Sequence, residues 1–155
     1  MAEDQQITWP AHLATIGAVR FARRSHHFDE SVAFYRDLVG LPVRETFRAS
    51  YGTDGVIFGL PGTSFTLEIV RSAEPVAVDA HEQLCLYFPS PRARDDARHR
   101  LLAVGFEPVP SHPYWEATDA VTYRDPDDRE VVFAPFVYGH NEPTAGGLDG
   151  EHDFR

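Results

Sequence analysis

Two groups of residues have side chains that commonly take part in catalysis. His26 and His27 are adjacent, and imidazoles exchange protons near neutral pH. They fall between a predicted strand and a predicted helix, where solvated loop residues are the more usual outcome. Cys85 is the only cysteine and lies in an apolar segment, which favours an inert buried thiol over a nucleophile. No serine lies in a nucleophile-elbow motif, so the sequence gives hydrolase chemistry no support.

The composition excludes several other classes of function. All 14 basic residues are arginine, which excludes lysine Schiff-base chemistry and a Walker-type phosphate lysine. The 24 acidic residues give a net charge of −10, which argues against nucleic acid as a partner. A single cysteine allows no intrachain disulfide and no cysteine metal cluster. The sequence contains no apolar run of the roughly 18 residues that a membrane span needs, and its acidic start predicts no secretory signal, so we expect a cytoplasmic protein.

Hydrophobic periodicity predicts strand, helix and three strands, twice over. In the first half a helix begins at the cap Asp29, runs to Val39 and stops at Gly40; the predicted strands are 16–22, 43–49, 55–60 and 65–70. In the second half a helix capped by Ser90 runs over 91–104 and stops at Gly105; the predicted strands are 83–88, 106–109, 120–124 and 131–136.

The two halves resemble each other at a separation of 65 residues, which predicts an internal repeat. The segment 38–41 matches 103–106, and Gly40 matches Gly105. We therefore expect one domain over 13–138, with modules at 13–74 and 80–138. The flanks are predicted to be an N-terminal arm at 1–12, anchored through Trp9, and a flexible acidic tail at 139–155.

Several segments carry a resemblance to a known family. The stretch 31–43 and the turn 125–128 are similar to the first helix with second strand, and to the late turn, of the vicinal oxygen chelate superfamily. This superfamily includes glyoxalase I, extradiol dioxygenases, and bleomycin- and fosfomycin-resistance proteins. A closer likeness, to the YycE-like branch, lies in 54–61, 67–68 and 113–115. The resemblance implies an α+β fold whose two βαβββ modules form a cupped, eight-stranded mixed sheet, an incomplete barrel with helices outside. It also implies a ligand cavity and a homodimer.

Enzymes of this superfamily hold a divalent metal with four side chains, and these positions can be compared with the present sequence. They correspond to Arg20, Glu68, Gln83 and Val132. A guanidinium keeps its proton and a valine has no donor atom, so one good ligand and one weak ligand remain. We therefore expect no metal and no other cofactor. If the correspondence with the superfamily's ligand positions is shifted by one or two residues, Glu68 and His81 could form a metal site. Two protein ligands rarely suffice to hold a metal.

The resemblance places Arg20 and Glu68 in the first cup, where two interpretations compete. Arg20 would bind a carboxylate, phosphate or enolate oxygen of a ligand, with Glu68 as a general base. Alternatively, the two residues form a buried ion pair that fills the space. Tyr114 and Trp115 stand near the place where aromatic residues of the resistance proteins stack on flat ligands; the alternative is that Trp115 seals the cup or an interface.

Two classes of function follow from these residues. The first is a metal-independent small-molecule binder, used for sequestration or resistance, with Arg20, Glu68, Gln83, Tyr114 and Trp115 as ligand-binding residues. The second is an enzyme, namely an isomerase, lyase or cyclase, with Arg20 as electrophile and Glu68 as base. A metal-dependent enzyme of the glyoxalase or dioxygenase type is the further alternative if the register is wrong.

Overall fold

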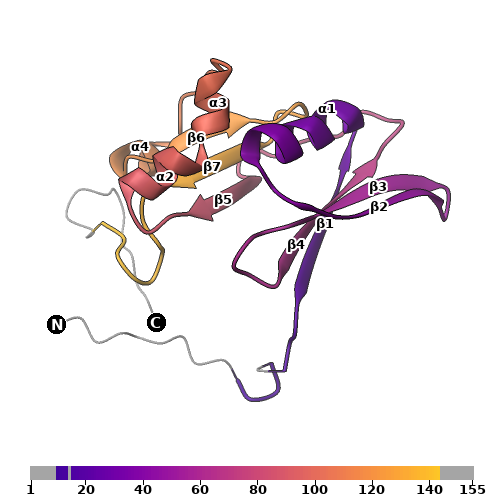
Figure 1. The fold of residues 1–155 in the computed structure, drawn as a ribbon, viewed down its shortest axis with the longest axis horizontal. Coiled ribbons are helices and arrows are strands. Elements are labelled where there is room, and N and C mark those ends of the chain that lie inside the picture. The colour runs from indigo at the N-terminus through magenta and orange to yellow at the C-terminus, as the bar shows by residue number, and fades with distance from the viewer. Residues whose placement is uncertain (1–9, 14, 144–155) are drawn as a thin grey trace. The chain divides into compact units, whose positions relative to one another are not determined.

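The computed structural model describes residues 10–13 and 15–143 and divides into two compact units, Met1–Val78 and Asp79–Arg155. Each unit contains a mixed β-sheet with helices, so the predicted α+β class is confirmed (Figure 1). Trp9 and residues 144–155 of the predicted tail lie outside the described residues. Within the described part, no helix is long and apolar enough to cross a membrane.

The first unit is a four-stranded sheet with helices on one face. Its elements are β1 (Val19–Ser25), α1 (Phe28–Ala33), η1 (Phe34–Val39), β2 (Val43–Ser50), β3 (Thr53–Gly59) and β4 (Phe65–Arg71). The strand order is β1-β4-β3-β2, with β1 parallel to β4 and the other pairs antiparallel. Alternate residues of the strands, such as Leu67 and Ile69, are buried with Phe28 and Tyr35 of the helices. The opposite face of the sheet carries Glu68.

The first helix starts two residues earlier than predicted. Its cap position is His27, and Asp29 lies inside the first turn, so the predicted cap at Asp29 is wrong. The Asp29 carboxylate instead accepts a hydrogen bond from Arg71 at 3.0 Å, and the Arg71 guanidinium lies 4.4 Å from the Phe28 ring centroid. The last turn, η1, is a π-helical turn that ends at Gly40 with φ +86°, as the predicted left-handed stop requires.

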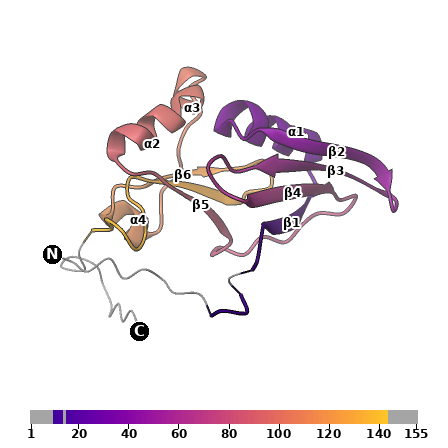
Figure 2. The same cartoon turned by 60° about the horizontal axis from the view of Figure 1, so that its bottom comes forward.

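The second unit is a three-stranded sheet. Its elements are β5 (Gln83–Tyr87), α2 (Pro91–Ala97), α3 (His99–Ala103), α4 (Pro113–Ala117), β6 (Val121–Arg124) and β7 (Glu130–Ala134). The strand order is β5-β7-β6, with β5 parallel to β7 and β6 antiparallel to it (Figure 2). This order repeats β1-β4-β3 of the first unit. β4 and β7 begin at positions 65 and 130, which is the predicted repeat distance.

Three predictions for the second unit are wrong. The segment 106–109 forms a single bridge, Val109 to Thr122, so the described residues contain seven strands in two sheets where eight strands were expected. The helix over 91–104 is broken at Arg98, and Val104, expected to face inward, is 64% exposed. The segment 113–115, expected in a loop, belongs to the short helix α4.

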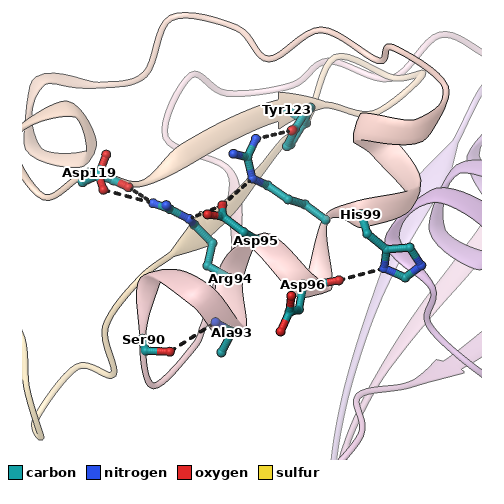
Figure 3. Close-up of polar contacts among 9 residues, drawn as sticks. Ser90, Ala93, Arg94, Asp95, Asp96, His99, Asp119 and Tyr123 are labelled. Carbon is teal, nitrogen blue, oxygen red and sulfur yellow. Dashed lines mark hydrogen bonds and ion pairs between the residues drawn. The ribbon is translucent and has the colours of Figure 1, made fainter.

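Two arginines, one on α2 and one at the break between α2 and α3, link this helical segment to the second sheet (Figure 3). The Arg94 guanidinium is buried and donates to the backbone carbonyl and the carboxylate of Asp119, just before β6. Arg98, at the break, donates to Asp95 at 2.9 Å and to the hydroxyl of Tyr123 on β6 at 3.0 Å. The hydroxyl of Ser90 accepts from the Ala93 amide at 3.1 Å, which confirms the predicted cap.

We expect Arg94→Met to lower the free energy of unfolding by about 2 kcal/mol, because the buried Arg94 guanidinium no longer donates to the carbonyl and carboxylate of Asp119. The matched control is Arg92→Met, on the same helix with an exposed side chain. Urea unfolding followed by circular dichroism measures both variants. Equal stability of the two variants would show that the Arg94 contacts do not hold the helix in place.

Candidate ligand-binding cleft

Arg20 and Glu68 lie side by side on one face of the first sheet. In the parallel pair of β1 and β4, Arg20 is opposite Thr66 and Ala22 is opposite Glu68. Arg20 and Glu68 therefore occupy neighbouring rows of the same face, because side chains two residues apart share a face. Nη1 of Arg20 is 3.4 Å from Oε2 of Glu68. The structure thus brings these two predicted site residues into contact.

The ion pair is open to solvent on the arginine side. The Arg20 side chain is 56% exposed and the Glu68 side chain is 15% exposed. This exposure corrects the interpretation of a buried pair that fills a dry space. A single long contact between a half-exposed guanidinium and a carboxylate contributes little to folding, since water competes for both charges. Arg20 also lines the space above this face of the sheet.

That space is a cleft of about 350 Å³ within the first unit. Its walls come from all four strands and from the turn that joins β2 to β3. The lining residues are Arg20, Glu45, Phe47, Ser50, Tyr51, Thr53, Ile57 and Glu68. The cleft therefore combines one guanidinium and two carboxylates with hydroxyl groups and apolar surface.

The apolar floor of the cleft depends on Gly55. A Cβ atom at this position would lie 2.2 Å from Cζ of Phe47, which means that the Phe47 ring lies directly over the glycine backbone. Gly55 pairs with Phe47 across β2 and β3, and Ile57, two residues on, is buried on the same face. A side chain at Gly55 would displace the ring. Glycine here permits the close approach that positions Phe47.

The hairpin wall is held by Asp54. Its carboxylate accepts a hydrogen bond from the Ala49 amide at 2.9 Å and one from Arg71 at 3.3 Å. The backbone hydrogen bond is the largest cause that lowers the pKa of Asp54 below its usual value. Ala49 and Tyr51 have φ values of 50° and 49°, a conformation that side chains rarely adopt and that this anchoring supports.

Gln83 and Trp115 form a separate cluster in the second unit. The Trp115 indole donates to Oε1 of Gln83 at 3.0 Å, and the Gln83 amide donates to Glu130 at 2.8 Å. Trp115 is 6% exposed and packs with Val132, Ala134 and Phe136. Tyr114 is half-buried beside it, with the two ring centroids 4.8 Å apart. Trp115 is therefore a core residue of its unit, with little ring area open for stacking on a ligand.

Cys85 lies beside this cluster, and its environment suppresses its reactivity. Burial, with a smaller contribution from the charge of Glu130, raises the pKa of the Cys85 thiol to about 11. At pH 8 only about one thiol in a thousand is then ionised, and the thiolate is the nucleophile.

We expect iodoacetamide to modify Cys85 at pH 8 roughly a hundredfold more slowly in the folded protein than in urea. Since the chain has one cysteine, mass spectrometry reads the rate without ambiguity. Comparable rates in the two states would show that the thiol is activated or accessible in the fold.

The comparisons with known proteins agree with this architecture. The YycE-like N-terminal domain model matches residues 19–70, and the YycE-like C-terminal domain model matches residues 82–134. The uncharacterized protein YycE of Bacillus subtilis is 34% identical over 122 residues, which are 74% of this chain and 85% of that protein. This chain belongs to the YycE-like family, within the vicinal oxygen chelate superfamily.

Solved structures place the YycE-like chain among the same relatives. A crystal structure of a YycE protein of unknown function from Bacillus subtilis has a TM-score of 0.66 and 31% identity, covering 76% of this chain and 88% of that one. FosX from Listeria monocytogenes, a fosfomycin resistance protein complexed with Mn(II) and 1S,2S-dihydroxypropylphosphonic acid, has a TM-score of 0.60, 12% identity and coverages of 77% and 91%. Lactoylglutathione lyase from Agrobacterium tumefaciens has a TM-score of 0.54, 20% identity and coverages of 76% and 91%. At these lower identities the last two share the fold alone.

The residues of the YycE-like chain do not fit the metal that the superfamily implies. Glu68 is ion-paired with Arg20, the Gln83 amide is bonded to Glu130 and Trp115, and Val132 is fully buried. Among residues 10–13 and 15–143, no three His, Cys, Asp or Glu side chains are grouped so that they could hold a metal ion. His81 is exposed beside Asp79 at 3.5 Å and belongs to the other unit from Glu68. His26 and His27 are exposed and contact each other edge to face, 5.3 Å apart.

Sequence reasoning missed Glu45, Phe47 and Tyr51 of the YycE-like cleft. Gly55 was the available signal, because a glycine within a strand often marks the close approach of another group. The partner that approaches it is decided by the pairing of β2 with β3, whose register shifts twice. The pattern of one strand does not contain that register.

Proposed function

We propose that this protein is a metal-independent small-molecule-binding protein of the glyoxalase and bleomycin-resistance type. In this proposal Arg20 binds an anionic oxygen group of the ligand at the cleft of the first unit. The observation that carries the proposal is the half-exposed Arg20 guanidinium in the cleft, which among the described residues is engaged by one 3.4 Å contact to Glu68. A sequestering or resistance role, a homodimer and a cytoplasmic location are parts of this proposal.

The donor capacity of Arg20 supports this role. A guanidinium has five N–H groups in a rigid plane, which suits carboxylate and phosphate oxygens. In the part of the chain that the structure describes, one of these groups donates to Glu68. Phe47 and Ile57 add apolar surface next to the charge. The combination favours an amphipathic ligand with an anionic head, because small-molecule sites pair apolar walls with a few placed polar groups.

The residue types at the superfamily's metal-ligand positions support ligand binding without a metal. A permanent cation stands at the first of the four ligand positions of the superfamily and a valine at the last. We expect binding of 3-phenylpropanoate, an anionic probe with an apolar body, to be unchanged after EDTA treatment and dialysis. Elemental analysis of the protein before treatment is the companion measurement. One zinc, nickel, iron or manganese ion per chain, lost in Glu68→Ala, would contradict the proposal.

An isomerase, lyase or cyclase activity is the second candidate function, and one observation favours it. Glu68 is mostly buried, lines the cleft and lies next to Arg20, so a bound ligand would meet a proton acceptor and a cation together. Glu68→Gln separates the two functions, since it keeps the size and removes the base. If Glu68→Gln loses turnover and retains ligand binding, the protein is an enzyme. If neither turnover nor binding changes, the small-molecule binder remains the function.

A further inference from the structure

A second carboxylate stands across the cleft from Glu68. Glu45 on β2 pairs with Ile57 on β3, and Ile57 pairs with Glu68 on β4. The two glutamates therefore lie in one row of the sheet, one on each side of Ile57. Adjacent strands are about 4.8 Å apart, so the two backbone positions are separated by about 10 Å. Extended glutamate side chains at this separation can both reach a cation that lies over Ile57.

The charges of the cleft are unbalanced. Glu68 contacts Arg20, whereas Glu45 is exposed and has no hydrogen-bond or ion-pair partner within residues 10–13 and 15–143. One guanidinium and two carboxylates give these lining residues a net charge of −1. A simple anion that approaches Arg20 would also meet two like charges, which costs affinity unless the anion brings a positive group with it.

We propose that the ligand is a zwitterion with an apolar body, of the amino-acid class. Its carboxylate binds Arg20, and its ammonium group binds Glu68 and Glu45. This inference rests on the proposed function, because it uses the same cleft and the same anchoring residue.

The spacing of the charges supports an amino acid over a longer zwitterion. Arg20 and Glu68 are in contact, with 3.4 Å between nitrogen and oxygen. A ligand whose carboxylate and ammonium are separated by one carbon can lie antiparallel to this pair, so that each charge faces its opposite. A ligand with distant charges would leave one of them away from its partner.

The remaining surface of the cleft fits the rest of such a ligand. The Phe47 ring, held over Gly55, and the Tyr51 side chain offer aromatic surface, and aromatic groups pack on such rings with favourable geometry. An aromatic amino acid is therefore the appropriate probe.

Three matched probes test the proposal by isothermal titration calorimetry with the full chain at low salt. L-phenylalanine has both charges, 3-phenylpropanoate lacks the ammonium, and phenethylamine lacks the carboxylate. We expect phenylalanine to bind about fivefold more tightly than 3-phenylpropanoate, as a partly exposed ammonium–carboxylate contact predicts. It should bind at least about tenfold more tightly than phenethylamine, which lacks the carboxylate that binds Arg20. Raising the salt concentration should reduce this advantage.

The Glu45→Gln variant tests whether Glu45 binds the ammonium group of the ligand. We expect it to weaken phenylalanine binding about threefold and to leave 3-phenylpropanoate binding unchanged or stronger. Glu30→Gln is the matched control; Glu30 is exposed on α1, which covers the other face of the sheet, so neither probe should be affected.

The outcomes separate this inference from the proposed function. If 3-phenylpropanoate binds as tightly as phenylalanine and depends on Arg20, the zwitterion is wrong and anion binding stands. If Glu45→Gln affects both probes equally, the ammonium does not bind at Glu45 and the inference is also overturned. If none of the three probes binds at millimolar concentration, or if binding is unaffected by Arg20→Met, both the inference and the proposed function fall.

Discussion

Replacing Arg20 with methionine is expected to weaken the binding of anionic probes at least about tenfold and to leave the protein folded. A charged hydrogen bond to a ligand contributes about 1.5–3 kcal/mol, so the dissociation constant for 3-phenylpropanoate should rise by about 10- to 100-fold. The free energy of unfolding should change by less than about 1 kcal/mol, because the contact with Glu68 is half-exposed. Methionine retains the apolar stem of the side chain, which keeps the packing comparable.

Calorimetric binding and urea unfolding of the same preparations measure the two effects. Arg44→Met serves as the matched control, since Arg44 is an exposed arginine of the same sheet that does not line the cleft. A large loss of stability in Arg20→Met, with the loss cancelled in the double variant with Glu68→Gln, would assign Arg20 a structural role. Retained anion binding in Arg20→Met would show that Arg20 does not bind the anion and would contradict the proposed function.

Trp115→Ala is expected to cost about 3–5 kcal/mol of unfolding free energy, the usual cost of removing a buried aromatic side chain. Trp115 packs with Val132, Ala134 and Phe136, and its indole donates to Gln83 at 3.0 Å. The substitution removes the packing and leaves Gln83 without that donor. Chemical unfolding monitored by far-ultraviolet circular dichroism measures the change, because the variant loses an indole that fluorescence would follow.

Trp115→Phe is the informative control. It keeps most of the buried ring and removes the N–H, so its cost should be near 1 kcal/mol, the contribution of one hydrogen bond. Binding of 3-phenylpropanoate should be unaffected in Trp115→Phe, since the structure uses this ring as core. If Trp115→Phe has normal stability but loses binding, Trp115 belongs to the ligand site. That is the role predicted from the similar position of aromatic residues in the resistance proteins.

Local residue chemistry was enough to predict much of the fold. Gly40 has the left-handed conformation that a helix stop requires, and Ser90 caps the helix that starts at Pro91. These features depend on a few neighbouring residues, so a single sequence contains them. The 65-residue repeat is confirmed by the shared strand order of the two sheets, because each copy of the pattern folds by the same local rules.

Features that depend on distant partners were not predictable from the sequence. The segment 106–109 was expected to be a strand, but whether a segment pairs depends on its neighbour, and one bridge, from Val109 to Thr122, forms. The helix over 91–104 has no breaker at Arg98; the break accompanies the bonds of that side chain to Asp95 and Tyr123. Propensity within a segment does not include such tertiary bonds.

The sequence by itself determined the residue types at the positions that correspond to the superfamily's metal ligands. An arginine at position 20 cannot ligate a metal, so this residue could be excluded as a ligand from the sequence alone. The tertiary structure decided what surrounds Arg20. Strand register determines how exposed the Arg20 side chain is, that the Phe47 ring lies over Gly55, and that Glu45 is opposite Ile57. Register brings together residues that are far apart in the chain, and a shift of one residue would turn each side chain to the other face of the sheet.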